Sequence, residues 1–399
     1  MKNSSHRPRA FVILACVSIG LGLTLSQSWS QDGNPAPASI PTTIATGGAA
    51  AIGSRANPAR VLGLVKANCK KCHANEVATW MKTKHYKADD RLSAPKAKEY
   101  ATAMGIKPAD MRKNSLCINC HATKTADADG GNVRALDYGV SCSSCHGGSG
   151  GKDGWLNPHG SFHETKKITS DQETAEHRKA RVEKCETAGM IRPARLYQLA
   201  KNCLSCHVVS NQKLVNAGHP AMHKDKFELV EWSSGEVRHN FQRDQKINQP
   251  VPSLWAKRTG GTEAARKRMK FLVGLFVELE AGVRNLSQVP ADDGKSKFAK
   301  FFAGRVKDLK GDFLEPIMEA FGDDPPEEIE AIYEAVDSIK IRTFNFKGGD
   351  DAKKALPSIE KNVKAFSQKY TGAKLMKIDD FMKEALGKPR GKVFQPAGS

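Results

Sequence analysis

The first long apolar stretch of the chain lies close to its N-terminus. Phe11 to Leu25 form an apolar run, basic residues precede it, and the small residues Ser28 and Ser30 follow it. This order is typical of an export signal, so we expect residues 1–30 to be removed. The run is short for a membrane span, which usually needs about 20 residues, and an uncleaved N-terminal anchor stays open as the alternative. No later segment is apolar enough to cross a membrane.

The pattern changes twice more along the chain. Residues 31–57 are rich in Ala, Pro, Gly, Ser and Thr without periodicity, which predicts a flexible leader. From about residue 258 onward, apolar residues recur at helical spacing. Such stretches cover residues 269–286, 298–309, 329–339, 355–370 and 378–386. We therefore expect a helical domain over residues 251–386, followed by a disordered basic tail at 387–399.

The composition offers little material for a conventional hydrophobic core in a chain of this size. Hydrophobic residues make up 39% of the sequence and aromatic residues 7%, and strand signals are weak throughout. A domain of residues 58–250 should therefore contain short helices and long loops around something other than side chains. The fold class we expect is mainly α, with the C-terminal helical region as a second part.

The positive charge is uneven along the chain. The net charge is +19, and residues 1–250 carry 35 basic and 21 acidic residues. An exported chain without interleaved basic and aromatic residues is a poor candidate for binding nucleic acid. A basic surface that docks an acidic partner protein fits this charge better.

Eight of the ten cysteines fall into four copies of one pattern, C-x-x-C-H. The copies are Cys69-Lys-Lys-Cys72-His73, Cys117-Ile-Asn-Cys120-His121, Cys142-Ser-Ser-Cys145-His146 and Cys203-Leu-Ser-Cys206-His207. This is the attachment motif of c-type haem. Disulfides or zinc are the alternatives for cysteine-rich sequences, but four copies that each end in His favour haem strongly.

The spacing of the motif has a chemical reason. Cysteines three positions apart lie on one face of a helical turn, so both sulfurs can form thioethers along one edge of a porphyrin. The adjoining histidine can then bind the iron. We expect four haem c groups, held by these cysteines and by His73, His121, His146 and His207. Their macrocycles would supply the apolar interior that the composition lacks.

The first and third motifs stand in contexts that resemble the tetrahaem cytochrome c-554 family. Trp80 and His85 follow the first motif, and the third motif stands in Gly139-Val-Ser-Cys142-Ser-Ser-Cys145-His146-Gly147. The resemblance covers residues 60 to 240 or so. It implies a multihaem cytochrome c that passes electrons between proteins, near nitrogen-oxide or hydroxylamine metabolism.

The same resemblance implies which histidines bind the opposite faces of the irons. His85 would face His207, and a histidine after the third motif would face His73. A histidine beyond the fourth motif would face His146, while the second haem would stay open. The histidines that match are His159, with His163 as runner-up, and His219, with His223 and His239 as competitors.

Two functions follow from these expectations. The favoured one is a periplasmic electron carrier rather than a catalyst, working with acidic redox partners. The alternative is a haem enzyme that reduces a small nitrogen oxide at an open iron on His121, which requires that no other histidine closes that site.

Overall fold

The fold was analysed in a computed structural model. It describes residues 69–70, 72–126, 133–135, 139–149, 154–160, 172–222, 227–238, 243–244, 249–250 and 261–394. The expected export signal and leader lie outside these residues, as do His163, His223 and His239. Within the described part of the chain, no helix is both long and apolar enough to cross a membrane.

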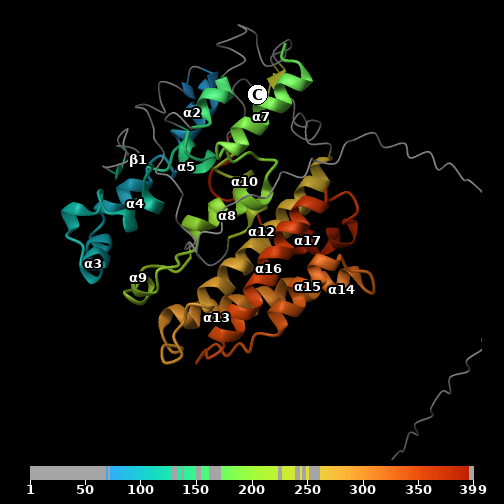
Figure 1. Ribbon diagram of the computed structural model, residues 1–399. Coiled ribbons are helices and arrows are strands. Elements are labelled where there is room, and N and C mark those ends of the chain that lie inside the picture. The colour runs from blue at the N-terminus through green and yellow to red at the C-terminus, as the bar shows by residue number, and fades with distance from the viewer. Residues whose placement is uncertain are drawn as a thin grey trace, which may run out of the picture. The chain divides into compact units, whose positions relative to one another are not determined.

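The region that carries the four motifs consists of short helices joined by loops (Figure 1). Its α-helices are α2 (Ala74–Trp80), α3 (Pro95–Ala103), α4 (Ser115–His121), α5 (Cys142–His146), α7 (Ala175–Thr187), α8 (Leu196–His207), α9 (Gln212–Asn216) and α10 (Leu229–Ser234). Two short 3₁₀ helices, η1 (Ala88–Ser93) and η2 (Pro108–Asp110), flank α3.

Two short β-ribbons interrupt these helices. Strands β1 (Lys124–Ala126) and β2 (Val133–Ala135) pair antiparallel, with Lys124 opposite Ala135. Strands β3 (Arg243–Asp244) and β4 (Gln249–Pro250) pair in the same sense. The mainly α fold class is confirmed.

The C-terminal region is a bundle of longer helices. These are α12 (Glu263–Leu286), α13 (Lys297–Leu309), α14 (Glu315–Phe321), α15 (Glu327–Asp337), α16 (Gly349–Lys369) and α17 (Asp379–Ala385), with the short η3 (Lys310–Leu314) and η4 (Met376–Ile378) between them. Hydroxyl caps start two of them, since Thr262 accepts from the Ala265 amide and Ser296 from the Ala299 amide. The predicted helical stretches are confirmed, and α16 begins six residues earlier than its apolar pattern.

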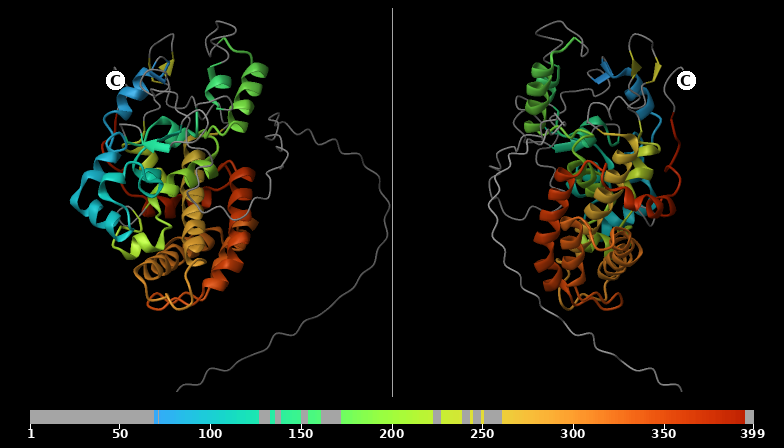
Figure 2. Two further views of the ribbon diagram at one scale, coloured as in Figure 1. Left: turned by 60° about the vertical axis from the view of Figure 1, so that its left-hand side comes forward. Right: turned by 90° about the vertical axis from the view of Figure 1, so that its right-hand side faces the viewer.

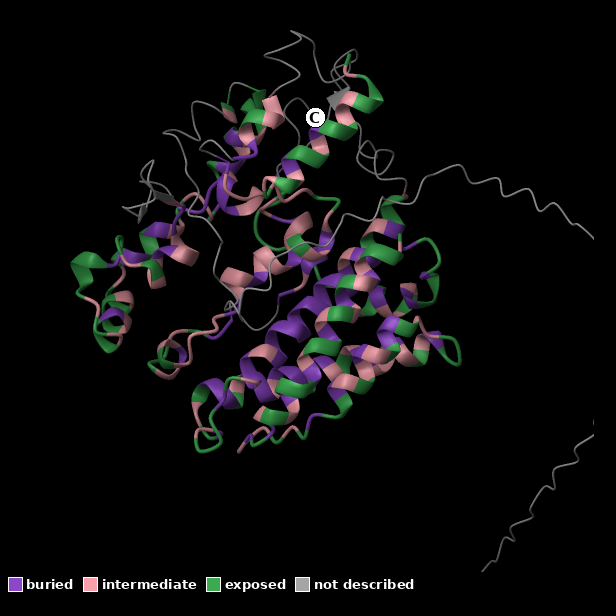
Figure 3. Ribbon diagram, viewed as in Figure 1, coloured by how far each residue is buried: buried purple, intermediate pink, exposed green. Residues whose placement is uncertain are grey.

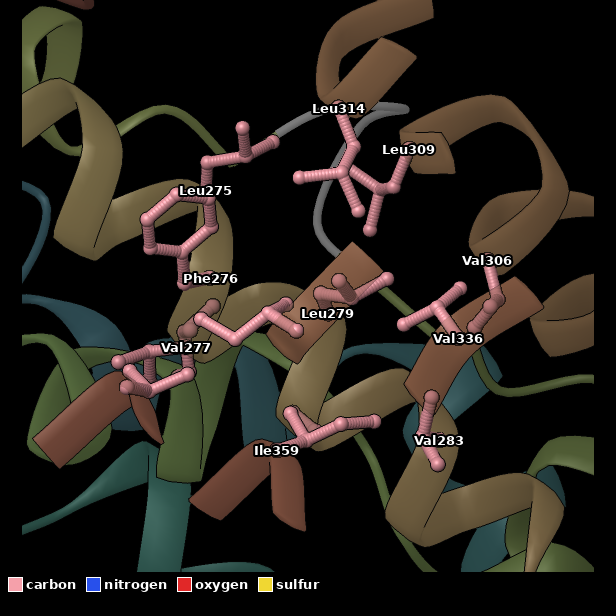
Figure 4. Packing of buried hydrophobic residues seen from close by; sticks show 14 of the residues in the cluster. Leu275, Phe276, Val277, Leu279, Val283, Val306, Leu309, Leu314, Val336 and Ile359 are labelled. Atoms are coloured by element: carbon pink, nitrogen blue, oxygen red, sulfur yellow. The ribbon is translucent and has the colours of Figure 1, made fainter. Parts of the chain in front are cut away.

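Helix α12 lies at the centre of this bundle. It packs against α13 and α16 on one side and against α8 and α10 on the other (Figures 1 and 2). Nearly all of its residues from Met269 to Leu286 are buried (Figure 3), as expected for a helix that is apolar around most of its circumference. Phe276, Leu279 and Val283 meet side chains of the neighbouring helices there (Figure 4).

The hydrophobic core is unevenly distributed over the described residues. One continuous cluster runs from Leu196 on α8 to Met382 on α17, across the domain boundary that we expected near residue 250. In the described residues before α8, one small hydrophobic cluster is made of Leu92, Ile118 and Ala122, and other buried side chains such as Trp80 and Trp155 lie outside it. Three motifs therefore lie where side chains alone form little core.

The segment after α17 differs from the disordered tail that we expected. Arg390 Nε donates to Glu231 Oε2 at 2.7 Å, and the Gly387 amide donates to Glu231 Oε1 at 2.7 Å. The Glu236 amide donates to the Arg390 carbonyl, and Phe394 is buried. Residues 387–394 are therefore attached to α10, because the buried Glu231 carboxylate takes its partners from them. Residues 395–399 lie outside the described part.

The packing of α10 on α12 depends on Gly274. A methyl group at this position would lie 2.7 Å from Leu229 Cβ, which cannot swing away. We expect Gly274→Ala to lower the free energy of unfolding by about 1–3 kcal/mol through overpacking. Chemical denaturation followed by circular dichroism measures this.

Gly304 on α13 is the matched control. A methyl group there meets nothing within 4 Å, so Gly304→Ala should raise the free energy of unfolding by about 0.5–1 kcal/mol through helix propensity. Equal effects of the two substitutions would contradict the close approach of α10 to α12.

Candidate haem-binding site

Each C-x-x-C-H motif forms about one helical turn. The second, third and fourth motifs are the last residues of α4, α5 and α8, and each of these helices ends at its motif histidine. In the first motif, the His73 amide donates to the Cys69 carbonyl at 2.8 Å, and α2 begins one residue later. None of the eight motif cysteines takes part in a disulfide among the described residues, and seven of them are partly buried.

The first and third motifs touch each other through their first cysteines. The thiols of Cys69 and Cys142 are hydrogen-bonded, which lowers the pKa of Cys69 and raises the pKa of Cys142. The two motifs are more than 70 residues apart in the chain. The fold therefore brings together two motifs that are far apart in the sequence.

The second and fourth motifs form another such pair. Cys206 Sγ lies 3.5 Å from the carbonyl oxygen of Asn119, and Cys120 Sγ lies 3.9 Å from the carbonyl oxygen of Ser205. These contacts join the C-terminal turns of α4 and α8, which pack against each other.

Asn202 connects the two pairs. Its side-chain Nδ2 donates to the carbonyls of Ser144 at 3.1 Å and Cys145 at 3.0 Å. The fourth motif thus contacts the third, and the four motifs form one series of neighbours in the order first, third, fourth, second.

Three histidines lie opposite motif histidines at one common separation. The ring centres of His73 and His159 are 6.1 Å apart, and those of His85 and His207 are also 6.1 Å apart. Those of His121 and His219 are 6.4 Å apart. The angles between the ring planes are 23°, 89° and 79° in the same order.

This separation fits an iron held between two imidazoles. Each ligating nitrogen lies about 2.0 Å from the metal and about 1.1 Å from its ring centre, so two axial imidazoles have centres about 6.2 Å apart. All three pairs come within a few tenths of an ångström of this value. The residues present therefore fit haem iron at three of the four motifs.

Backbone carbonyls hold several of these rings in a ligating orientation. Nδ1 of His121 lies 3.3 Å from the Ala88 carbonyl, and Nδ1 of His146 lies 3.1 Å from the Ile191 carbonyl. Nδ1 of His219 lies 2.9 Å from the Pro220 carbonyl. A ring that donates from Nδ1 keeps the lone pair of Nε2 for a metal.

Burial also favours the neutral form of these histidines, which is the form that binds a metal. Burial, together with the nearby His73 and Arg181, lowers the pKa of His159 to about 4. Burial likewise lowers the pKa of His121 and of His219. The Nδ1 atom of His159 is buried without a hydrogen-bond partner among the described residues.

The pairings agree in part with those that the resemblance implies. His85 lies beside His207, and His159 lies beside His73. His219 lies beside His121, whereas the resemblance implied a place opposite His146. The remaining described histidine, His177, is held by the carboxylate of Glu173 at 2.8 Å.

Two glycines around the third motif are required by close backbone contacts. A methyl group on Gly139 would lie 2.4 Å from the carbonyl oxygen of His85. Gly147 has a φ of +88°, and a methyl group there would lie 2.1 Å from the Gly189 carbonyl oxygen. The amide of Val140 donates to the His85 carbonyl at 2.8 Å, so this segment fixes the backbone of one candidate ligand.

Aromatic side chains that the sequence analysis did not assign line the histidines. Tyr100 on α3 lies edge-on to His219, with ring centres 5.3 Å apart. Phe227 and Trp232 lie beside His207, at 5.5 and 5.0 Å. Their spacing in the sequence gives no sign of this, because each contact joins distant segments.

The chemistry of the donor set argues against zinc. Structural zinc sites gather four Cys, His or carboxylate ligands in one place. Within the part of the chain that the structure describes, no group of three or more such side chains is arranged to hold a metal ion by itself. Two imidazoles with ring centres about 6.2 Å apart suit an iron whose other ligands come from a porphyrin.

Comparison with known proteins supports the same assignment. Residues 68–147 match the family model for cytochrome c554 and c-prime. No curated protein and no solved structure matches the chain. Cytochrome c domains are typically exported, carry haem c with its iron, and exchange electrons with redox partner proteins. Residues 68–147, which contain the first three motifs, are therefore similar to the cytochrome c554 and c-prime family, and this match supports a c-type cytochrome in electron transfer.

Proposed function

We propose that the protein is a periplasmic tetrahaem cytochrome that carries electrons between redox proteins. The fourth motif, at residues 203–207, lies outside the matched segment but repeats the same pattern of residues. In this proposal, residues 58–250 form the haem domain. The helical domain of residues 251–386 supports that domain structurally. The resemblance favours a place near nitrogen-oxide or hydroxylamine metabolism.

The observation that carries this proposal is the unbroken series of contacts among the motifs. Cys69 touches Cys142, Asn202 bonds to Cys145, and Cys206 touches the backbone of Asn119. Bound haem supplies a reversible one-electron centre. Because neighbouring motifs touch, four such centres would form one path, with the first and second motifs at its ends.

Three kinds of group in the chain would serve the haems in this proposal. The motif cysteines would fix each macrocycle by its edge, and pairs of histidines would hold three of the four irons. Carbonyls of Ala88, Ile191 and Pro220 orient three of the imidazoles, which is how metal-binding histidines are usually positioned.

A basic segment lies near the second motif, at one end of the path. Residues 82–113 carry nine basic and four acidic residues. Lys96 Nζ lies 5.7 Å from the ring centre of Tyr100, which contacts His219. Lys98 and Lys107 are exposed on or beside α3. An acidic redox partner that docked here would come close to the second haem, and its association would be steered by charge.

The number of haems is the first test. The mature holoprotein should exceed the mass of its polypeptide by four haem groups, and a pyridine haemochrome assay should give four haems per chain. The Cys203→Ser/Cys206→Ser variant should carry three, since thioethers cannot form at that motif. Colourless protein with the mass of the bare chain would disprove the proposal.

Asn202 provides a test of the contact between the third and fourth motifs. Asn202→Ala leaves the Ser144 and Cys145 carbonyls without the side-chain donor, which should destabilise the holoprotein by about 1–3 kcal/mol. Thermal unfolding followed in the haem absorption band measures this. Asn362, whose side chain donates to the Ser358 carbonyl at an exposed position of α16, is the control, and Asn362→Ala should change stability by less than about 0.5 kcal/mol.

Charge reversal on the basic segment tests the docking site. Electron transfer to an acidic redox protein should slow steeply as salt is added, because screening weakens long-range attraction. Lys98→Glu/Lys107→Glu should slow the reaction at low salt several-fold and flatten its salt dependence. Lys353→Glu/Lys354→Glu, an exposed pair on α16, is the control and should change the rate less. A rate that does not depend on salt would contradict charge-steered docking.

A further inference from the structure

We propose that His219 is the second axial ligand of the iron attached at Cys117 and Cys120, and that the C-terminal helices hold it there. This inference rests on the proposed haem loading. It assigns a closed, six-coordinate iron to the site that the resemblance implied would be open.

The pair of His121 and His219 has the geometry of the two other candidate pairs. Its ring centres are 6.4 Å apart, against 6.1 Å for His73 with His159. Two axial imidazoles require about 6.2 Å. Packed phenylalanines of the bundle reach similar separations, such as 6.1 Å for Phe271 with Phe381, so the assignment also needs the orientation of the two imidazoles.

Both rings of the pair have Nδ1 already engaged with the backbone. Nδ1 of His219 lies 2.9 Å from the carbonyl of Pro220, and Nδ1 of His121 lies 3.3 Å from the carbonyl of Ala88. Each ring therefore keeps Nε2 for the iron, as the outer contacts of ligating histidines commonly arrange.

The backbone at His219 is set by the end of α9. Gly218 has a φ of +102°, a conformation that glycine adopts without steric cost. The His219 amide donates to the Leu214 carbonyl at 3.2 Å, and the Tyr100 ring contacts the imidazole edge-on. His219 is thus fixed relative to α9 and α3.

Helix α9 is in turn attached to the C-terminal bundle. The Phe298 amide of α13 donates to Asn216 Oδ1 at 3.0 Å, and Gln212 Nε2 donates to Asp293 Oδ2. Phe298 itself is fully buried in the bundle core. Because the bundle lies outside the matched family segment, it provides a support that the family match does not include. Asn216 is a positioning residue in this scheme.

Carbon monoxide binding to the reduced holoprotein tests the assignment, because the gas binds where an axial position is open. His219→Ala should bind one more equivalent per chain than the wild type, and the ferric protein should gain one high-spin electron paramagnetic resonance signal. Added imidazole should reverse both changes. His177→Ala is the matched control, since His177 pairs with Glu173, and it should match the wild type.

Asn216→Ala tests the role of the bundle. Loss of the contact with the Phe298 amide should give a fraction of an equivalent of additional carbon monoxide binding, with the haem count unchanged. If Asn216→Ala binds no more carbon monoxide than the wild type, Asn216 has no positioning role. The ligand assignment would then depend on the result with His219→Ala alone.

The outcomes separate this inference from the proposed function. Fewer than four haems per wild-type chain would refute the tetrahaem proposal itself. Four haems, with His219→Ala identical to the wild type, would overturn the ligand assignment alone.

The electron paramagnetic resonance spectrum of the ferric wild type tests the assignment without any variant. Imidazole planes near perpendicular give low-spin ferric signals of large maximal g value. The planes at 79° and 89° therefore predict two haems of that type, and a spectrum without any such signal would also overturn the assignment.

Discussion

In the proposed tetrahaem protein, the motif-bearing region would depend on thioether bonds between its cysteines and the macrocycles. Before α8, the described residues provide one small apolar cluster, formed by Leu92, Ile118 and Ala122. A domain of this size needs a much larger buried apolar surface to offset the loss of conformational entropy. Four covalently held porphyrins would provide that surface, so haem attachment and folding should be coupled here, as metal binding and folding are in small metal-dependent domains.

The C-terminal bundle has the opposite character, because its side chains form a continuous core of their own. That core reaches into α8, where Leu196, Ala200 and Leu204 are buried with residues of α12. The same helix ends in the fourth motif. A buried carboxylate strengthens the connection, since Glu280 on α12 accepts from Lys201 Nζ and Tyr197 Oη at 3.0 Å each. The bundle is therefore a rigid base for the motif that contacts two others.

The sequence predicted the features that depend on local order. A C-x-x-C-H motif needs one helical turn, and the described motifs adopt one. The long C-terminal helices follow from apolar periodicity alone, and their starts agree with caps such as Thr262. The partner of His219 could not be predicted in this way, because the contact with His121 depends on how α9 lies against α13. The ordered segment after α17 was missed because Arg390 finds the buried Glu231 only in the folded chain.

The support of α9 by the bundle bears on the choice between carrier and enzyme. A small nitrogen oxide could reach the second iron only by displacing His219, which the fold already holds beside His121. A tethered ligand competes at an effective concentration of the order of millimolar or above, and its ordering cost is met when the chain folds. Each contact that fixes α9, such as that between Asn216 and the Phe298 amide, therefore disfavours binding of an external ligand. A six-coordinate iron can still exchange electrons through the edge of its macrocycle. On this argument, the C-terminal helices favour electron transfer over catalysis at the second site.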